Sequence, residues 1–271
     1  VFDDAEKFGL WPKTYEWIYE KGWLQDFLTA LKDSSSIKAQ TFSSFYDSHR
    51  PLSLAYLPSV SYYEMGEWSM ASANATEIGK IKTDVTETFG ETAADMFVRG
   101  GTWKNFFSKY PESNRMHKHM LRLSHIAKTR HDILLDEALM KAEANDVLWH
   151  GIFGGVYLPN LRDNCYKYLL ECERLLLKTP SCEVGDENYD GFDEVRFTIN
   201  TVSLLFETKN GAQLSEFGLL DAYFNYQNTL RRTKEEYHER LAETKMKDAA
   251  LHDGVETIHD ATFSIPDEMR E

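Results

Sequence analysis

The sequence has few of the features that mark the special classes of protein. Its three cysteines, Cys165, Cys172 and Cys182, form no CxxC pair and no metal-ligand spacing. An odd number of cysteines favours buried free thiols in a reducing, cytoplasmic compartment over a disulfide framework. No apolar stretch approaches the roughly 20 residues that a membrane-spanning helix requires, so we expect no membrane partner.

Basic residues are also in the minority. The sequence has 30 lysines and arginines against 44 acidic residues, a formal net charge of -14, and its basic residues form no cluster. This argues against a nucleic-acid partner, because proteins that bind a phosphate backbone carry a clustered basic footprint. The GxSxG motif, the P-loop and the dinucleotide-binding fingerprint are absent as well.

What remains is the composition of an ordinary globular protein. Hydrophobic residues make up 42% of the 271 residues and charged residues 27%, which is enough apolar material for a substantial core. The sequence opens with Val1 rather than methionine and stops at Glu271 without a tail-like composition. We therefore expect both ends to be cuts within a longer protein.

The first part of the chain combines a strand end with short helices. Residues 1–11 resemble the exit of a buried strand, since two apolar residues are followed by Asp3, Asp4 and Glu6. Carboxylates that follow a strand are typical of the active face of a parallel α/β barrel. Helical periodicity runs over residues 13–31 with a break at Gly22, and residues 41–46 predict another short helix.

Long helical patterns dominate from about residue 67 to about residue 177. One pattern places Met116, Met120, Leu123 and Ala127 on a single apolar face. A second places Leu135, Leu139 and Ala142 together in the same way. The middle of the chain is therefore predicted to be a helical bundle.

A change to strand patterns follows residue 190. Residues 178–190, with a proline and a glycine, are the best candidate for a linker. Residues 195–200, 201–207 and 213–217 predict strands, and the sequence Lys209-Asn210-Gly211 predicts a hairpin turn. A charged helical segment is predicted over residues 233–243.

Asp4 and Glu6 form the first candidate site. They are two residues apart on an extended segment, so their side chains share one face. Two carboxylates that converge in a cleft are what glycoside hydrolysis requires. By spacing alone the pair is better explained as two solvated surface acids, which is the commoner situation.

Asp146, Trp149 and His150 form the second candidate site. Their spacing of i, i+3 and i+4 predicts one helix face beside a glycine-rich loop. The acid and the imidazole can bond sugar hydroxyls, while the indole offers an apolar platform for a pyranose ring. The alternative is a helix end whose polar groups cap the loop. His117 and His119, in contrast, diverge on a helix and predict no metal site.

Several long motifs, in order along the whole chain, resemble glycoside hydrolase family 57. They are Asp3-Asp4-Ala5-Glu6-Lys7-Phe8-Gly9-Leu10-Trp11-Pro12, Tyr62-Tyr63-Glu64-Met65-Gly66-Glu67-Trp68-Ser69, Arg99-Gly100-Gly101-Thr102-Trp103 with its continuation to Asn114, Asn145-Asp146-Val147-Leu148-Trp149-His150-Gly151 with its continuation to Pro159, Tyr189-Asp190-Gly191-Phe192, and Ile265-Pro266-Asp267-Glu268. The α-amylase and 4-α-glucanotransferase branch is the most similar.

The resemblance implies a mixed, multidomain fold. Residues 1–65 would be the remnant of an incomplete (β/α)7 barrel, residues 66–180 an α-helical bundle that completes the active site, and residues 181–271 the start of a β-sandwich. It also implies that the enzyme acts on α-1,4-glucans and maltooligosaccharides with no metal or organic cofactor. Whether it forms a homo-oligomer stays open.

The resemblance assigns roles to eight residues. Asp4 would be the catalytic acid/base, and the substrate-binding residues would be Glu6, Trp11, Glu67, Trp68, Asp146, Trp149 and His150. The nucleophile of the family is a glutamate on an earlier strand that this sequence does not contain, so we expect the isolated chain to be inactive. The function that the resemblance implies is that of a retaining 4-α-glucanotransferase, which transfers α-1,4-glucan segments through a glycosyl-enzyme intermediate. Hydrolysis as in α-amylases and a non-catalytic glucan-binding or structural remnant are the alternatives.

Overall fold

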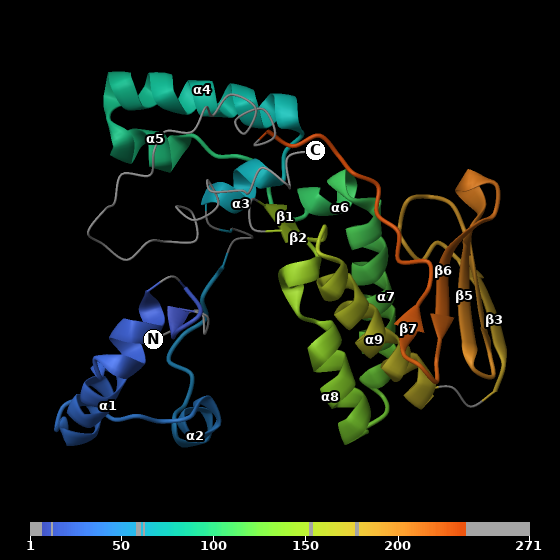
Figure 1. Ribbon diagram of the computed structural model, residues 1–271, viewed down its shortest axis with the longest axis horizontal. Helices are drawn as coiled ribbons and strands as arrows, with labels where there is room; N and C mark the ends of the chain where they lie inside the picture. The colour runs from blue at the N-terminus through green and yellow to red at the C-terminus, as the bar shows by residue number, and fades with distance from the viewer. Residues whose placement is uncertain are drawn as a thin grey trace. The chain divides into compact units, whose positions relative to one another are not determined.

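The computed structural model describes residues 7–11, 13–57, 61, 63–151, 154–176 and 179–236. The chain divides into two compact units, one formed by Val1–Ser59 with Leu241–Glu271 and the other by Val60–Arg240. Figure 1 shows the elements of each unit. Within the described ranges, every helix is too short or too polar to cross a membrane.

The first unit contains the two helical segments that the sequence predicts. The π-helix η2 (Glu16–Glu20) and the helix α1 (Trp23–Asp33) are separated by Gly22, whose φ of 77° lies in the left-handed region. The helix α2 (Phe42–Ser48) begins after Thr41, whose hydroxyl accepts a hydrogen bond from the Ser44 amide. Both helical predictions are confirmed, whereas the predicted strand end at residues 1–6 lies outside the described residues.

The second unit contains a helical bundle and a separate pair of helices. The bundle consists of α3 (Tyr63–Trp68), α6 (Asn105–Lys109), α7 (Pro111–Ala127), α8 (Ile133–Ala142) and α9 (Pro159–Leu176), which share one core. The helices α4 (Ser72–Phe89) and α5 (Glu91–Phe97) pack against each other and contribute no residue to that core. The two apolar faces that the sequence predicts on α7 and α8 are confirmed, because all of their members are buried in one core. Burial of each large apolar side chain in such a core contributes about 1.5–3 kcal/mol.

A five-stranded antiparallel sheet follows the bundle. Its strands are β3 (Ser181–Gly185), β4 (Glu194–Ile199), β5 (Val202–Glu207), β6 (Gln213–Leu219) and β7 (Phe224–Asn225), neighbours in that order. The three predicted strands and the predicted turn are confirmed, with Gly211 at a φ of 72°.

The predicted linker at residues 178–190 is wrong, because it contains β3. Cys182 of β3 pairs with Phe197 of β4, so the main-chain groups of this polar segment are bonded in the sheet. Pro180 and Gly185 mark the two ends of the strand rather than an irregular segment. The thiol of Cys182 is exposed, in contrast to the predicted buried thiol, whereas Cys165 and Cys172 are buried.

The predicted charged helix at residues 233–243 falls at the edge of the described chain. Residues 233–235 are irregular, and residues from 237 onward lie outside the described residues.

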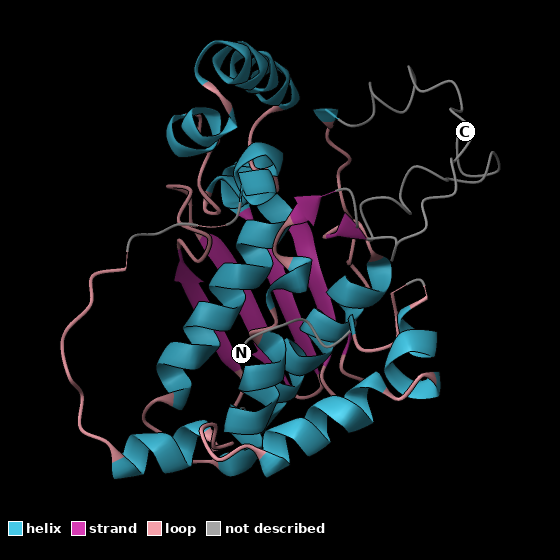
Figure 2. Cartoon of the chain, turned by 90° about the vertical axis from the view of Figure 1, so that its left-hand side faces the viewer, coloured by secondary structure: helices cyan, strands magenta, loops and turns pink. Residues whose placement is uncertain are grey.

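Charged side chains join the bundle to one face of the sheet. Figure 2 shows the helices packed across the sheet, whose strands are magenta. Arg196 of β4, 1% exposed, bonds Glu173 of α9 at 3.3 Å and Glu216 of β6 at 3.0 Å, and His119 of α7 bonds Glu173 at 3.0 Å. Burial alone would raise the pKa of Glu216, but the charges of Arg196 and His119 outweigh it and lower that pKa to about 2.

Removing Arg196 should destabilise this interface strongly. We expect Arg196→Met to lower the free energy of unfolding by about 3–5 kcal/mol, because the buried Glu173 and Glu216 would each lose one of the cations that compensate their charge. Chemical denaturation checks the value. Arg174→Met is the matched control, since Arg174 pairs with Asp221 in a largely exposed bridge at 3.3 Å and should cost about 1 kcal/mol or less.

Candidate functional site

Two of the sequence motifs meet through glycine backbone. Gly66 lies in α3, and the amide of Gly101 donates a hydrogen bond of 2.9 Å to its carbonyl. A Cβ on Gly100 would lie 2.8 Å from the amide nitrogen of Glu67, closer than real Cβ contacts. Glycine at these positions therefore allows the segment around residue 100 to pack directly against the helix that carries Glu67 and Trp68.

The third motif brings a second indole to the same place. The rings of Trp68 and Trp149 are stacked, with centroids 5.9 Å apart and planes 5° apart. A Cβ on Gly151 would collide with the Trp68 ring, so this glycine lets the backbone lie against the indole. Both tryptophans are half-buried and pack against the edge of the bundle core. The pair forms a partly open aromatic platform.

The prediction that Asp146, Trp149 and His150 share one helix face is wrong. The helical turn here is the short 3-10 helix η3 (Asn145–Val147), and His150 belongs to the strand β1 (His150–Gly151). That strand pairs with β2 (Gly154–Gly155), where φ values of 114° and 85° are open to glycine alone at low cost. The amide of Val156 donates to the carbonyl of Trp149 at 2.8 Å. Glycines therefore turn the chain into a hairpin where the spacing predicts a continued helix.

His150 holds this hairpin together. It is 4% exposed, and its Nδ1 donates a hydrogen bond to the carbonyl oxygen of Gly154. Its ring also meets Tyr157 at a centroid distance of 4.1 Å and Tyr110 at 6.1 Å, both edge to face. Asp146, by contrast, is exposed.

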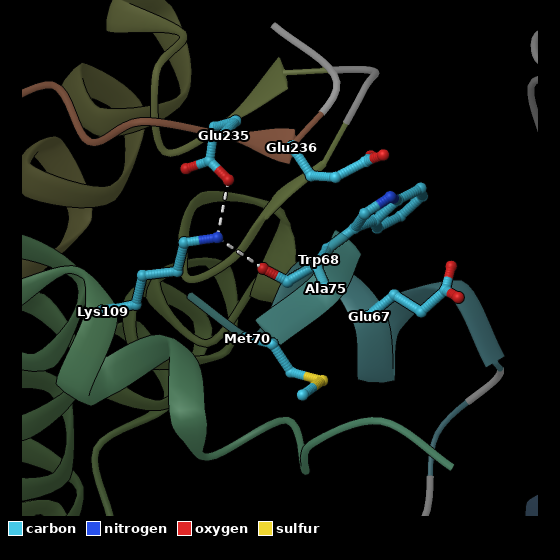
Figure 3. A pocket seen from close by; sticks show the side chains of 7 residues that line it. All are labelled: Glu67, Trp68, Met70, Ala75, Lys109, Glu235 and Glu236. Carbon is cyan, nitrogen blue, oxygen red and sulfur yellow. Dashed lines mark hydrogen bonds and ion pairs between the residues drawn. The ribbon is translucent and has the colours of Figure 1, made fainter. Parts of the chain in front are cut away.

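A pocket adjoins Trp68. It is lined by Glu67, Trp68, Met70, Ala75, Lys109, Glu235 and Glu236, which come from α3, the turn after it, α4, α6 and the chain after β7 (Figure 3). Lys109 donates to the carbonyl oxygen of Trp68 at 2.8 Å and to Glu235 Oε2 at 2.6 Å. Burial, together with the nearby Glu67 carboxylate, raises the pKa of Tyr63 above its usual value.

Sequence reasoning found part of this set. The structure brings Glu67, Trp68, Trp149 and His150 into one region of the second unit. Asp4 and Glu6 lie outside the described residues, and Trp11 is a half-buried residue of the first unit. The sequence did not predict three pocket residues, Lys109, Glu235 and Glu236. No sequence pattern indicates their polar contacts, because the residues that meet are far apart along the chain. Among the described residues, no group of three or more His, Cys, Asp or Glu is placed to hold a metal ion.

Most of the chain after residue 100 is similar to known protein families. Residues 101–176 match the family model described as the middle domain of α-amylase/4-α-glucanotransferase, and residues 186–271 match the model of the C-terminal domain. This chain belongs to the α-amylase/4-α-glucanotransferase family. The resemblance that the motifs predict is therefore confirmed.

Individual members of this family are similar to the chain over nearly its whole length. An α-amylase of Pyrococcus furiosus is 38% identical and a 4-α-glucanotransferase of Thermococcus litoralis is 37% identical, each over 99% of this chain. The crystal structure of the Thermococcus litoralis enzyme matches 88% of the chain with a TM-score of 0.69. The chain spans 40% of the length of the two curated relatives. The family is thus one of glucan-active enzymes.

Proposed function

We propose that this chain is part of a longer, retaining 4-α-glucanotransferase that acts on α-1,4-glucans and maltooligosaccharides. The observation that carries the proposal is the stacked pair of Trp68 and Trp149, half-buried and adjacent to the carboxylate of Glu67. An aromatic face binds the apolar side of a pyranose, and carboxylates accept hydrogen bonds from its hydroxyls. The names of the relatives support the same class of substrate.

In this proposal Asp4 is the acid/base of the reaction. A retaining mechanism needs two carboxyl groups about 5–5.5 Å apart, one that attacks the sugar and one that protonates the leaving oxygen. Asp4 would donate that proton, and a second carboxylate such as Glu6 would favour its protonated form. The attacking glutamate would lie upstream of this chain, so the chain alone would be inactive.

The domain boundaries are also part of the proposal. We assign residues 1–65 to the end of a (β/α)7 barrel, 66–180 to the bundle and 181–271 to the start of a β-sandwich. The outer face of the sheet supports the sandwich, because the register aligns Phe197, Leu204 and Phe217 in one apolar row there. Val184 and Ile199 share that face and are 66% and 45% exposed. A second sheet would bury such a face.

Hydrolysis is the second candidate, favoured by the relatives named α-amylase. The two activities differ in whether a sugar acceptor or water takes up the glycosyl group. Transfer requires a site that excludes water and stacks the acceptor, and the tryptophan pair could supply the stacking. A non-catalytic glucan-binding role is the third candidate. It requires the same aromatic platform but no proton transfer by Asp4.

Products from maltotetraose separate these functions. We expect the longer enzyme to convert maltotetraose into a ladder of longer and shorter oligomers with little net increase in reducing ends, because each bond broken is replaced by another. Chromatography of the products and a reducing-end assay measure the two quantities. One new reducing end for every bond cleaved would identify a hydrolase, and no conversion at all would favour the non-catalytic role.

A further inference from the structure

The chain after the sheet runs back along the bundle. Its described residues make a series of contacts with α7, α9 and the segment before α9: Asn228 bonds Arg162 and Asp163, the Arg231 amide bonds Glu112, and Thr233 bonds the Tyr157 hydroxyl. The segment from residue 226 to residue 236, here called the return segment, ends at the pocket beside Trp68. The sheet region thereby supplies residues to a site built mainly by the bundle.

The last contact of the return segment is a buried ion pair. Lys109 and Glu235 are 2.6 Å apart, and their side chains are 7% and 4% exposed. The Tyr110 hydroxyl donates a further hydrogen bond to Glu235 Oε1. A buried lysine needs its counter-ion and its remaining hydrogen bonds to be satisfied, so each partner fixes the position of the ammonium group.

The second partner of Lys109 is the carbonyl oxygen of Trp68, at 2.8 Å. Figure 3 shows the ammonium group lying between Glu235 and this carbonyl, while the Trp68 side chain extends away from it. Trp68 is the last residue of the six-residue helix α3, whose final carbonyl groups have no partner within the helix. Lys109 therefore fixes the end of α3 from which the indole extends toward Trp149.

We propose that Lys109 and Glu235 are positioning residues for the stacked tryptophans, so that the return segment holds the saccharide platform in place. The inference rests on the proposed function, because it takes the platform to bind saccharide. The charge of Lys109 is directed to protein groups on both sides, so its effect on a sugar is exerted through Trp68. Loss of the pair should weaken saccharide binding without removing any group that touches the sugar.

Binding of maltoheptaose to the 271-residue chain tests this, measured by isothermal titration calorimetry. Trp68→Ala should weaken binding by about tenfold, the upper end of one aromatic contact. Lys109→Met should weaken it by about three- to tenfold, and Lys109→Arg, which keeps the charge and the donors, should restore most of the loss. In a Trp68→Ala background, Lys109→Met should cost less than about twofold more, because residues that act as a unit are not additive.

Glu207→Gln is the matched control for Glu235→Gln. Glu207 of β5 also pairs with a bundle cation, Arg115 of α7, at 2.6 Å, but neither residue lines the pocket beside Trp68. Melting temperatures of both variants report the general loss of an ion pair between sheet and bundle. We expect Glu235→Gln alone to weaken maltoheptaose binding.

The outcomes distinguish the two proposals. If the wild-type chain and Trp68→Ala bind maltoheptaose equally, or neither binds, the platform itself and the inference both fail. If Trp68→Ala weakens binding while Lys109→Met and Glu235→Gln match the wild type, the inference is overturned and the platform stands. The inference would also be overturned if Glu235→Gln and Glu207→Gln weakened maltoheptaose binding equally. Full additivity of the effects of Lys109→Met and Trp68→Ala on binding would overturn it as well.

Discussion

In the longer enzyme, Asp4→Asn should lower the rate of maltooligosaccharide conversion by at least about 10²-fold. This is the lower scale for the loss of a positioned general acid, because an amide cannot protonate the departing glycosidic oxygen. The steady-state rate on maltotetraose measures the effect. Asparagine has nearly the shape of aspartate. The change therefore removes the ability to donate a proton without altering how the side chain packs.

An aryl α-glycoside provides the control for this prediction. A phenolate that leaves easily needs little protonation, so the first step on such a substrate should be far less affected by Asp4→Asn. An equal loss on both substrates would point to a damaged site rather than to a lost acid. Near-normal turnover of maltotetraose would show that Asp4 is not the acid/base.

The bundle was largely predictable because its helices have one solvent face and one core face. Met116, Met120, Leu123 and Ala127 recur at helical spacing, and only one surface of a helix can turn toward the core. The break at Gly22 was predictable for a similar reason, since the left-handed conformation there favours glycine.

Spacing was a poor guide where local chain turns compete with periodicity. The i, i+3, i+4 pattern of Asp146, Trp149 and His150 fits a helix, but the chain forms a 3-10 turn and then a hairpin. The sequence predicts only a loop at Gly151, Gly154 and Gly155. The close contacts of Gly151 with Trp68 and of Gly155 with the Trp149 carbonyl, which require the absence of a Cβ, depend on tertiary structure.

The sheet shows another limit of sequence patterns. Alternation correctly predicted β4, but it did not reveal that Arg196 faces the bundle while Phe197 lies on the outer face. The charge is buried there because Glu173 and Glu216 compensate it. Those partners come from α9 and β6. Lys109 and Glu235 were missed for the same reason, since 126 positions separate them.

Asp146→Ala should lower the catalytic efficiency of the longer enzyme by roughly 10- to 150-fold. In the proposed site the Asp146 carboxylate accepts hydrogen bonds from the sugar in the transition state, and the alanine variant would lose them. Each hydrogen bond to a charged group is worth about 1.5–3 kcal/mol, which corresponds to this loss in rate. Asp146 is exposed, and no bond of its side chain to another described residue is seen. Its removal should therefore leave the melting temperature nearly unchanged.

Glu137→Ala serves as the matched control for Asp146→Ala. Glu137 is an exposed acid in the middle of α8, so its loss removes the same charge from the bundle surface. We expect its catalytic efficiency and its melting temperature to match those of the wild type. A loss of activity in both variants would reflect the charge of the bundle as a whole rather than a contact with the glucan.

The most direct test of a glucan site in the bundle is kcat/KM for maltotetraose, measured with the melting temperature for the wild type and Asp146→Ala. Our account predicts a loss of at least about tenfold in kcat/KM with a change in melting temperature of no more than about 2 °C. Normal kcat/KM with a clearly lower melting temperature would contradict it, and would assign Asp146 to the end of a structural turn.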